Sequence, residues 1–91
     1  MAESLWLEGT WLHDNGDDEG ARMAFNHSRL MDPAFAGAHY NYAALTEKKT
    51  GKSAEALAAW RDYLKAAEGD RRQAREIVEK VREHTRAWEK S

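Results

Sequence analysis

Small and aromatic residues recur along the chain at a fixed interval, and this recurrence constrains the fold more than any other feature. A glycine, an alanine and an aromatic residue appear in the same order twice, 35 residues apart. Self-similarity at an interval of about 20–50 residues is typical of stacked helical repeats. The recurring pairs are Gly16 and Gly51, Ala21 and Ala56, and Phe25 and Trp60. Repeats of this kind build a surface that holds another protein, so the pattern predicts a binding module.

The spacing of apolar residues predicts five helices and an all-α fold. The expected helices cover residues 4–14, 18–31, 34–49, 53–68 and 70–88. Ser4, Ser53 and Asp70 are the expected N-caps of the first, fourth and fifth helices, because their side chains accept hydrogen bonds from free backbone N–H groups. The second helix is expected to stop before Pro33, since proline disfavours helical geometry in the residue that precedes it.

Three- and four-residue steps along these helices predict which side chains face the core. In the second helix the expected inward residues are Ala21, Ala24, Phe25, Ser28 and either Leu30 or Met31, and in the fifth they are Ala74, Ile77, Val78, Val81 and Trp88. Trp11 and Trp60 are also expected in the core. For Trp88 two placements stay open: it packs against the fourth helix, or it lies exposed at an interface.

Length and composition limit the class of protein. A chain of 91 residues has room for one domain with one core. It contains no cysteine, no apolar run of the ~20 residues needed to span a bilayer and no basic segment leading into an apolar stretch at its start. These features leave the compartment open but favour the cytoplasm. No membrane partner is expected. The formal net charge of −2 argues against general phosphate binding, so no nucleic acid partner is expected.

The stretch from Leu5 to Pro33 resembles one unit of the tetratricopeptide repeat (TPR) family. Leu5 and Leu12 stand in place of the family's Trp and Tyr, and Glu8 departs from its usual Leu. The positions at the family's intervals are Gly9, Gly16, Ala21, Phe25 and Pro33. Gly9 and Ala21 are small enough to let two antiparallel helices approach, while Phe25 fills the space beside them.

A second stretch looks similar, with Tyr40-Asn41-Tyr42-Ala43 where the family often has Tyr-Asn-Leu-Gly. The resemblance implies antiparallel helix-turn-helix repeats that form a short right-handed α-solenoid of five helices. It implies a single domain over residues 1–91, with repeat one at about 3–33, repeat two at about 34–68 and a capping helix at about 70–89. The last helix is also compatible with the start of a third repeat, but a terminal helix needs a polar outer face, which favours the cap.

The second unit is one residue longer than the first, which leaves two registers for the third helix. Aligning Gly9 with Ala44 buries Glu47, whereas aligning Gly9 with Ala43 buries Tyr42 and Leu45 and leaves Glu47 in water. Because burial of an unpaired charge is costly, the second register is expected. The extra residue then lies in the turn at residues 48–52.

The resemblance implies a function as a protein–protein interaction adaptor, with a peptide or partner segment held in a concave groove. Carried over by position, the groove residues are Trp6, Leu7, Thr10, His13, Tyr40, Asn41, Ala44, Lys48, Arg72 and Arg75, with Glu3 beside them. Asn41 has both a donor and an acceptor for a ligand backbone, or is simply an exposed helical residue. Trp6 and Tyr40 form an aromatic floor or belong to the core. The ligand expected from this set is an apolar or aromatic segment with an acidic end.

Self-association is the alternative function. Two repeats and a cap fall below the three repeats usually needed for independent stability. This leaves three alternatives open: a fragment of a longer repeat array, a minimal domain with an unusually aromatic core, or a homo-oligomer that completes its core by self-association.

The sequence does not point to an enzyme, a metal site or a cofactor. The four histidines are scattered and have no cysteine partners, whereas zinc needs three or four converging ligands. The acidic run at residues 14–20 lacks the spacing of a calcium loop and is interpreted as a polar turn. No phosphate-binding glycine loop or nucleophile motif is present.

Overall fold

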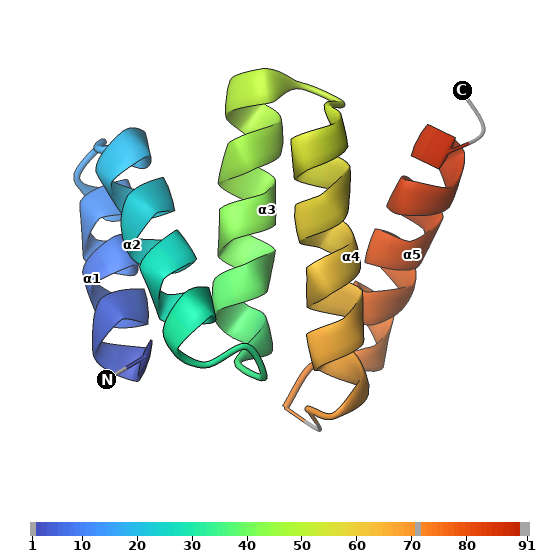
Figure 1. Cartoon of the computed structure of the whole chain (residues 1–91), viewed down its shortest axis with the longest axis horizontal. Helices are drawn as coiled ribbons and strands as arrows, with labels where there is room; N and C mark the ends of the chain where they lie inside the picture. Colours follow the sequence, from blue (N-terminus) through green and yellow to red (C-terminus); the bar gives the residue numbers. More distant parts are fainter. Residues whose placement is uncertain (1, 71, 90–91) are drawn as a thin grey trace.

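The computed structural model describes residues 2–70 and 72–89, and these residues form five helices and no strand. The helices are α1 (Ala2–Asp14), α2 (Asp18–Met31), α3 (Ala36–Thr50), α4 (Ala54–Glu68) and α5 (Arg75–Glu89). Successive helices run in opposite directions along an array that measures 35 × 29 × 20 Å (Figure 1). The predicted all-α fold, with neighbouring helices packed against each other, is confirmed.

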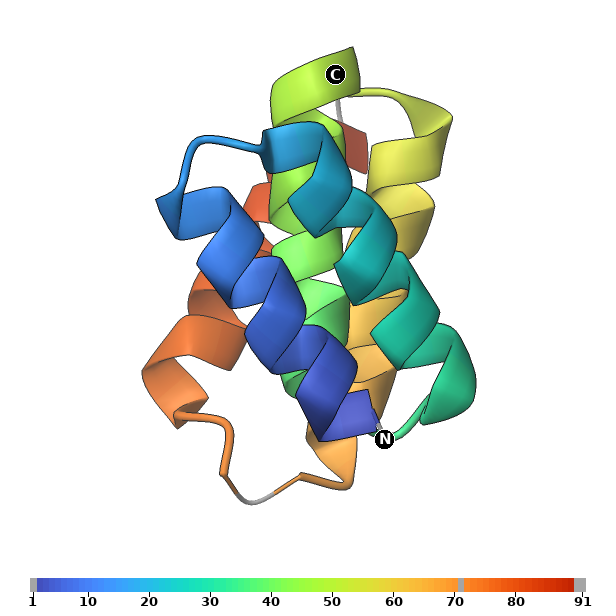
Figure 2. The same cartoon turned by 90° about the vertical axis from the view of Figure 1, so that its left-hand side faces the viewer.

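The helices form two hairpins and a final single helix. α1 packs on α2 and α3 on α4 over the most extensive contacts, α2 joins the two hairpins, and α5 packs on α4 over a smaller area. α2 and α4 follow one side of the array, while α1 and the start of α5 lie on the other side of α3 (Figure 2). The face formed by α1, α3 and α5 is therefore distinct from the face formed by α2 and α4. None of the helices in the described part of the chain is long and apolar enough to cross a membrane.

Polar side chains cap the starts of α2 and α4, and a glycine ends α3. The Asp17 carboxylate accepts a hydrogen bond from the backbone N–H of Gly20 at 2.9 Å and begins α2. Ser53 Oγ accepts one from the backbone N–H of Ala56 at 3.1 Å, which confirms the N-cap predicted for α4. Gly51 ends α3 with a φ of 70°, a conformation that glycine adopts without the steric cost of a Cβ.

Two of the predicted N-caps are wrong: Ser4 lies inside α1, which begins at Ala2, and α5 begins at Arg75 rather than after Asp70. Asp70 does act as a cap, but of a turn: its carboxylate accepts a hydrogen bond from the backbone N–H of Arg72 at 2.9 Å. The turn is fixed further by Tyr63, whose hydroxyl donates to Gln73 Oε1 at 2.9 Å. Asp70, Arg72 and Gln73, which precede α5, therefore have hydrogen bonds of their own. In the same way, α3 begins at Ala36 rather than Ala34, since Asp32 accepts from the backbone N–H of Ala34 at 3.2 Å.

The recurring small and aromatic residues pack within each hairpin. Ala21 and Phe25 are buried in the first hairpin, and their counterparts Ala56 and Trp60 are buried in the second. Gly9 is buried against Phe25 so closely that a Cβ added at Gly9 would lie 2.7 Å from the ring carbon Cε1. The small residues are therefore packing choices, as the sequence predicts.

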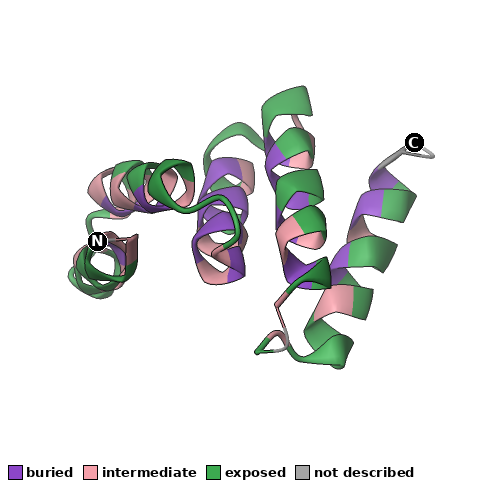
Figure 3. Cartoon of the chain, turned by 60° about the horizontal axis from the view of Figure 1, so that its bottom comes forward, coloured by how far each residue is buried: buried purple, intermediate pink, exposed green. Residues whose placement is uncertain are grey.

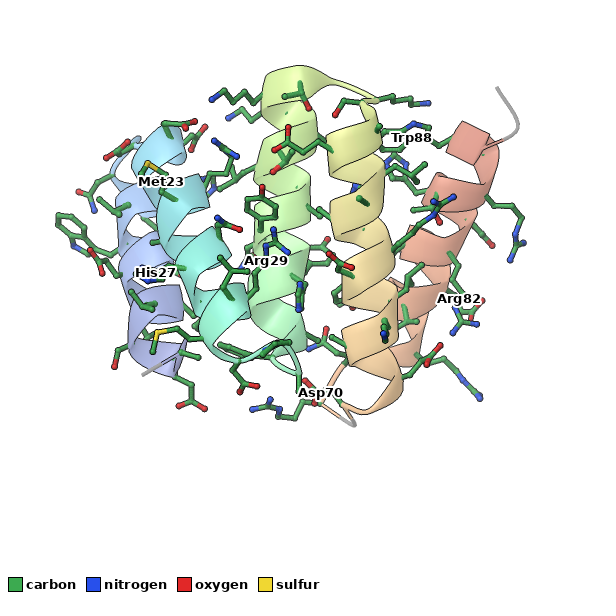
Figure 4. All side chains as sticks on the ribbon, viewed as in Figure 1. Met23, His27, Arg29, Asp70, Arg82 and Trp88 are labelled. Carbon is green, nitrogen blue, oxygen red and sulfur yellow. The ribbon has the colours of Figure 1, made fainter. Side chains whose placement is uncertain are left out.

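Several apolar residues predicted in the core lie at the surface instead. Trp11 and Leu30 are each 63% exposed, and Met31, Ile77 and Ala74 are also exposed. In the first hairpin the reason is coverage, because within the described residues only its α3 side packs extensively on another helix, and its ribbon shows exposed stretches (Figure 3). Trp60 is buried, as predicted. Trp88 is also buried, and it points from α5 toward α4, whereas Arg82 points away from the array (Figure 4).

The structure agrees with one half of the register prediction for α3 and corrects the other. Tyr42 and Leu45 are buried, as expected from the alignment of Gly9 with Ala43. Glu47 does not lie in water: its side chain is only 26% exposed and accepts hydrogen bonds from other helices. The turns at residues 15–17 and 51–53 have equal length, so the extra residue lengthens α3 rather than the connection.

Candidate functional site

The face formed by α1, α3 and α5 contains three neighbouring hollows, which together we call the groove. The α1–α3 hollow has a volume of about 390 Å³. The Arg72 hollow, of about 310 Å³, lies beside the start of α1 and α3 and the turn before α5. The α3–α5 hollow has a volume of about 330 Å³. Trp6 lines both of the first two hollows, while Ala44 and Lys48 line both the α1–α3 and the α3–α5 hollow.

Most of the residues predicted for a groove line these hollows. Leu7 and Arg72 line the Arg72 hollow together with Glu3, and Tyr40 lines the α3–α5 hollow. Arg75 lines none of the three, because it lies in the first turn of α5 beyond the Arg72 hollow. The α1–α3 hollow is lined by Trp6, Thr10, His13, Asn41, Ala44 and Lys48, with Phe25 and Leu45 at its base.

Trp6 forms the wall between two of the hollows. Its ring packs against Phe35 with the ring centroids 6.0 Å apart and the planes tilted by 56°. Its indole nitrogen is buried close to Gly37 and has no hydrogen-bond partner among the described residues. A half-buried indole held in this way offers a large rigid contact area with little loss of side-chain entropy on binding.

Asn41 lines the α1–α3 hollow and is half-buried. Within the described part of the chain its side-chain amide makes no hydrogen bond, whereas the nearby Thr10 hydroxyl donates to the backbone oxygen of Trp6 at 3.0 Å. The amide therefore keeps both its donor and its acceptor for a bound backbone.

Ion pairs between helices neutralise the upper rim of the groove. Lys48 Nζ donates to Asp18 Oδ2 at 2.6 Å, and His13 Nδ1 lies 2.8 Å from Asp18 Oδ1. The hydrogen bond from Lys48, followed by that from His13, lowers the pKa of Asp18. Next to it, hydrogen bonds from Arg22 and Lys49 lower the pKa of Glu19 to about 2. The positive charge of Lys48 at this rim is thus already paired.

Arg72 is also paired at the other end of the groove. Its Nε donates to Asp70 Oδ1 at 3.0 Å, and its guanidinium carbon lies 5.7 Å from the centroid of the Phe35 ring. The side-chain and backbone hydrogen bonds from Arg72 lower the pKa of Asp70. An acidic ligand end would have to compete with Asp70 for this arginine.

The α3–α5 hollow contains three residues that the sequence did not suggest for the site, Glu47, Trp60 and His84. Trp60 Nε1 donates to Glu47 Oε1 at 2.8 Å, and His84 Nε2 donates to the same oxygen at 2.7 Å. A signal for Glu47 was present, because it follows Tyr40 and Ala44 at helical steps of four and three residues and so lies on their face. His84 could not be paired with it from sequence, since the two are 37 residues apart.

A larger hollow, of about 510 Å³, lies on the α2 and α4 side and contains none of the predicted groove residues. Arg29 and Asp62, at its edge, are 3.5 Å apart and pair with each other, and the Arg29 guanidinium covers the Tyr42 ring at 4.1 Å (Figure 4). His39 Nε2, at its base, donates to the backbone oxygen of Pro33 at 2.8 Å. Arg29, Asp62 and His39 Nε2 therefore have partners, whereas His39 Nδ1 is buried and has none among the described residues.

Comparisons of the chain with protein-family models, with curated proteins and with solved structures find no significant match. Among the described residues, no group of three or more His, Cys, Asp or Glu side chains is arranged to hold a metal ion.

Proposed function

We propose that the chain is a protein–protein interaction adaptor of the tetratricopeptide type, which binds an extended segment of a partner protein in its groove. The observation that carries this proposal is the row of three neighbouring hollows along α3. Adjacent hollows share Trp6 or Ala44 and Lys48 as lining residues, so one extended segment that follows the row would contact α1, α3 and α5 together. The five helices and the packing of Gly9 against Phe25 support the tetratricopeptide architecture.

The chemistry of the α1–α3 hollow favours an apolar or aromatic side chain of the partner beside a peptide backbone. Trp6, Phe25 and Leu45 supply an apolar lining, and burial of apolar surface is the main favourable contribution to most protein associations. Asn41 supplies a free donor and a free acceptor, which suits the alternating N–H and C=O groups of an extended backbone. Because Arg72 is paired with Asp70, the acidic ligand end expected from the sequence is not part of this proposal.

Selection of peptides from a random displayed library, followed by affinity measurement, tests the proposed groove. Asn41→Ala and Trp6→Ala should each weaken binding of a selected peptide by about tenfold, since each removes a contact of about 1.4 kcal/mol. Glu83→Gln is the control, because Glu83 is exposed on α5 and lines none of the three hollows. Unchanged affinity in both groove variants would remove the groove from consideration.

A separate observation favours self-association as a second candidate function. Five of the six exposed large hydrophobic residues among those described lie in the first hairpin: Leu7, Trp11, Met23, Leu30 and Met31. Exposed apolar surface of this kind is typical of an interface. Sedimentation over a range of concentrations should then show a dimer that Trp11→Ala dissociates, and a monomer at high micromolar concentration would rule this function out.

A further inference from the structure

The carboxylate of Glu47 is the first observation for a more specific site in the groove. Both of its hydrogen bonds within the described chain fall on Oε1, from the indole of Trp60 and the imidazole of His84. Oε2 has no hydrogen-bond donor among the described residues. Lys48, the neighbouring cation in the same hollow, is held by Asp18 at 2.6 Å. Glu47 therefore brings into the groove a carboxylate with one oxygen that no described residue occupies.

Aromatic rings form the walls around this carboxylate. Tyr40 and Trp60 meet edge to face with their centroids 5.4 Å apart, and Trp60 meets His84 in the same way at 5.9 Å. All three line the α3–α5 hollow with Glu47. Aromatic faces attract cations through their quadrupole, and the attraction grows when the cation is partly removed from water. A carboxylate between aromatic walls is suited to an ammonium or guanidinium group.

The position of the hollow connects it to the proposed peptide path. Ala44 is exposed on α3 and lines both the α1–α3 and the α3–α5 hollow. Its small side chain leaves room for a chain to pass from one hollow to the other. A segment whose apolar residue lies against Trp6 would thus place a following side chain next to Glu47.

We propose that the α3–α5 hollow is a subsite for a lysine or arginine side chain of the bound segment, with Glu47 as its counter-charge and Tyr40 and Trp60 as its walls. This proposal rests on the proposed function, because it names the chemistry of the partner in the same groove. It gives the partner a basic residue beyond its apolar one.

The test uses small probes, so that it does not depend on finding a peptide. Nα-acetyl-lysine methylamide is titrated into the protein at about pH 8, where an imidazole is largely neutral, and the indole N–H signal of Trp60 is followed by NMR. That N–H donates to Glu47, so its shift reports a cation at the carboxylate. The lysine derivative should shift the signal, whereas Nα-acetyl-norleucine methylamide, which has no charge, should not. Equal responses to the two compounds would overturn the proposal.

Glu47→Gln should weaken binding of the lysine derivative by about tenfold, whereas Glu83→Gln should leave it unchanged. Glutamine keeps an oxygen that can accept hydrogen bonds from Trp60 and His84. If Glu47 had a purely structural role, Glu47→Gln would therefore bind the lysine derivative as well as the unaltered protein does. Unchanged binding to Glu47→Gln would contradict the subsite. If the variant does not fold, the comparison of lysine and norleucine derivatives on the unaltered protein still decides.

A library-selected peptide separates the subsite from the groove itself. Replacing its basic residue by norleucine should weaken binding by about tenfold and remove the difference between the unaltered protein and Glu47→Gln. If the affinity of a selected peptide depends on Trp6 and Asn41 but not on a basic residue, the groove is supported and the subsite is contradicted. If the affinity is the same in the Trp6 and Asn41 variants as in the unaltered protein, the groove itself is contradicted.

Discussion

The two hairpins carry the same pattern of small and aromatic residues but differ in how well they are covered. In both, the aromatic residue of the repeat is buried, Phe25 in the first and Trp60 in the second. The second hairpin has α2 on one side and α5 on the other, whereas in the described part of the chain the first hairpin packs extensively on another helix at its α3 side alone. Accordingly Trp60 joins a network that reaches Glu47 and His84, while Trp11 in the first hairpin is exposed.

This difference shows what a repeat motif determines and what it leaves to the neighbouring helices. The motif residues decide the packing inside a hairpin, because they set how closely its two helices approach. The outer side of each hairpin depends on whether another helix covers it, as expected for an array in which each unit contacts only its neighbours. Equivalent changes in the two hairpins should therefore have unequal effects.

The largest effect is expected for a pair of tryptophan substitutions, one in each hairpin. Trp60→Ala should lower the free energy of unfolding by about 3–5 kcal/mol, since it removes a buried ring and leaves a cavity. Trp11→Ala should change it by less than about 0.5 kcal/mol, because Trp11 is exposed. Chemical denaturation of a monomeric sample measures both. Similar losses in the two variants would show that the first hairpin is covered in solution.

A smaller effect is expected for Gly9→Ala, which probes the packing inside the first hairpin. The added Cβ would overlap the Phe25 ring, and the cost of overpacking should exceed the gain in helix propensity by about 1–2 kcal/mol. Gly69→Ala is the matched control, because an added Cβ there approaches no atom more closely than 4.0 Å. Thermal denaturation should separate the two variants. A Gly9→Ala protein as stable as the control would mean that the two helices of this hairpin are not held so close together.

Thr46 lies on α3, in the better covered second hairpin. Thr46→Val should leave the free energy of unfolding unchanged or raise it by up to about 1 kcal/mol. The Thr46 hydroxyl is fully buried and has no hydrogen-bond partner among the described residues. Replacing an unpaired buried hydroxyl by a methyl group of similar shape removes its desolvation cost. A loss of more than about 1 kcal/mol in a denaturant titration would instead indicate that the hydroxyl has a partner in solution, such as a bound water molecule.

The smallest effect concerns the exposed ion pairs that join the hairpins. The pKa of Glu19 lies at about 2 instead of the usual 4.5, because Arg22 and Lys49 donate to its carboxylate. A carboxylate whose pKa is lowered by folding contributes stability above its unfolded pKa and loses that contribution as the pH falls. The contribution of Glu19 should therefore be present above about pH 4.5 and be lost progressively toward pH 2.

Urea midpoints between pH 5 and pH 2 measure this dependence. Glu19→Gln should slightly reduce the change of the urea midpoint with pH. Glu8→Gln, at an exposed position on α1, should show the same change as the unaltered protein. The same slope in all three proteins would mean that the link between α2 and α3 at Glu19 adds nothing in solution.

The helices and hairpin packing could be predicted from the sequence because both depend on local spacing. Ser53, Gly51 and the small residues at Gly9 and Ala21 act on residues close to them in the chain or in the same hairpin. The start of α5 could not be predicted, since Asp70 has the residue type of an N-cap for either a helix or a turn. Asp70 caps a turn, and the same turn is held by the hydrogen bond between Tyr63 and Gln73. The residues next to Asp70 in the sequence do not predict that hydrogen bond.

The candidate site was predictable where it depends on one helix face and not where it depends on contacts between distant helices. The helical stripe that includes Trp6 and Thr10 lines a hollow, as does the stripe of Asn41 and Ala44. The network around Glu47 needs α3, α4 and α5 at once. The sequence alone predicts that Glu47 stays in water, because the donors from Trp60 and His84 that offset the cost of its burial are distant in the chain.

Chemical-shift mapping of a library-selected peptide on the isotopically labelled protein tests the central claim most directly. If the groove is the binding site, the largest changes should fall on residues that line it, above all Trp6, Asn41 and Tyr40. The outer surface of the first hairpin, marked by Trp11 and Met23, should then change little. The largest changes on Trp11 and Met23, with none at Asn41, would contradict the account.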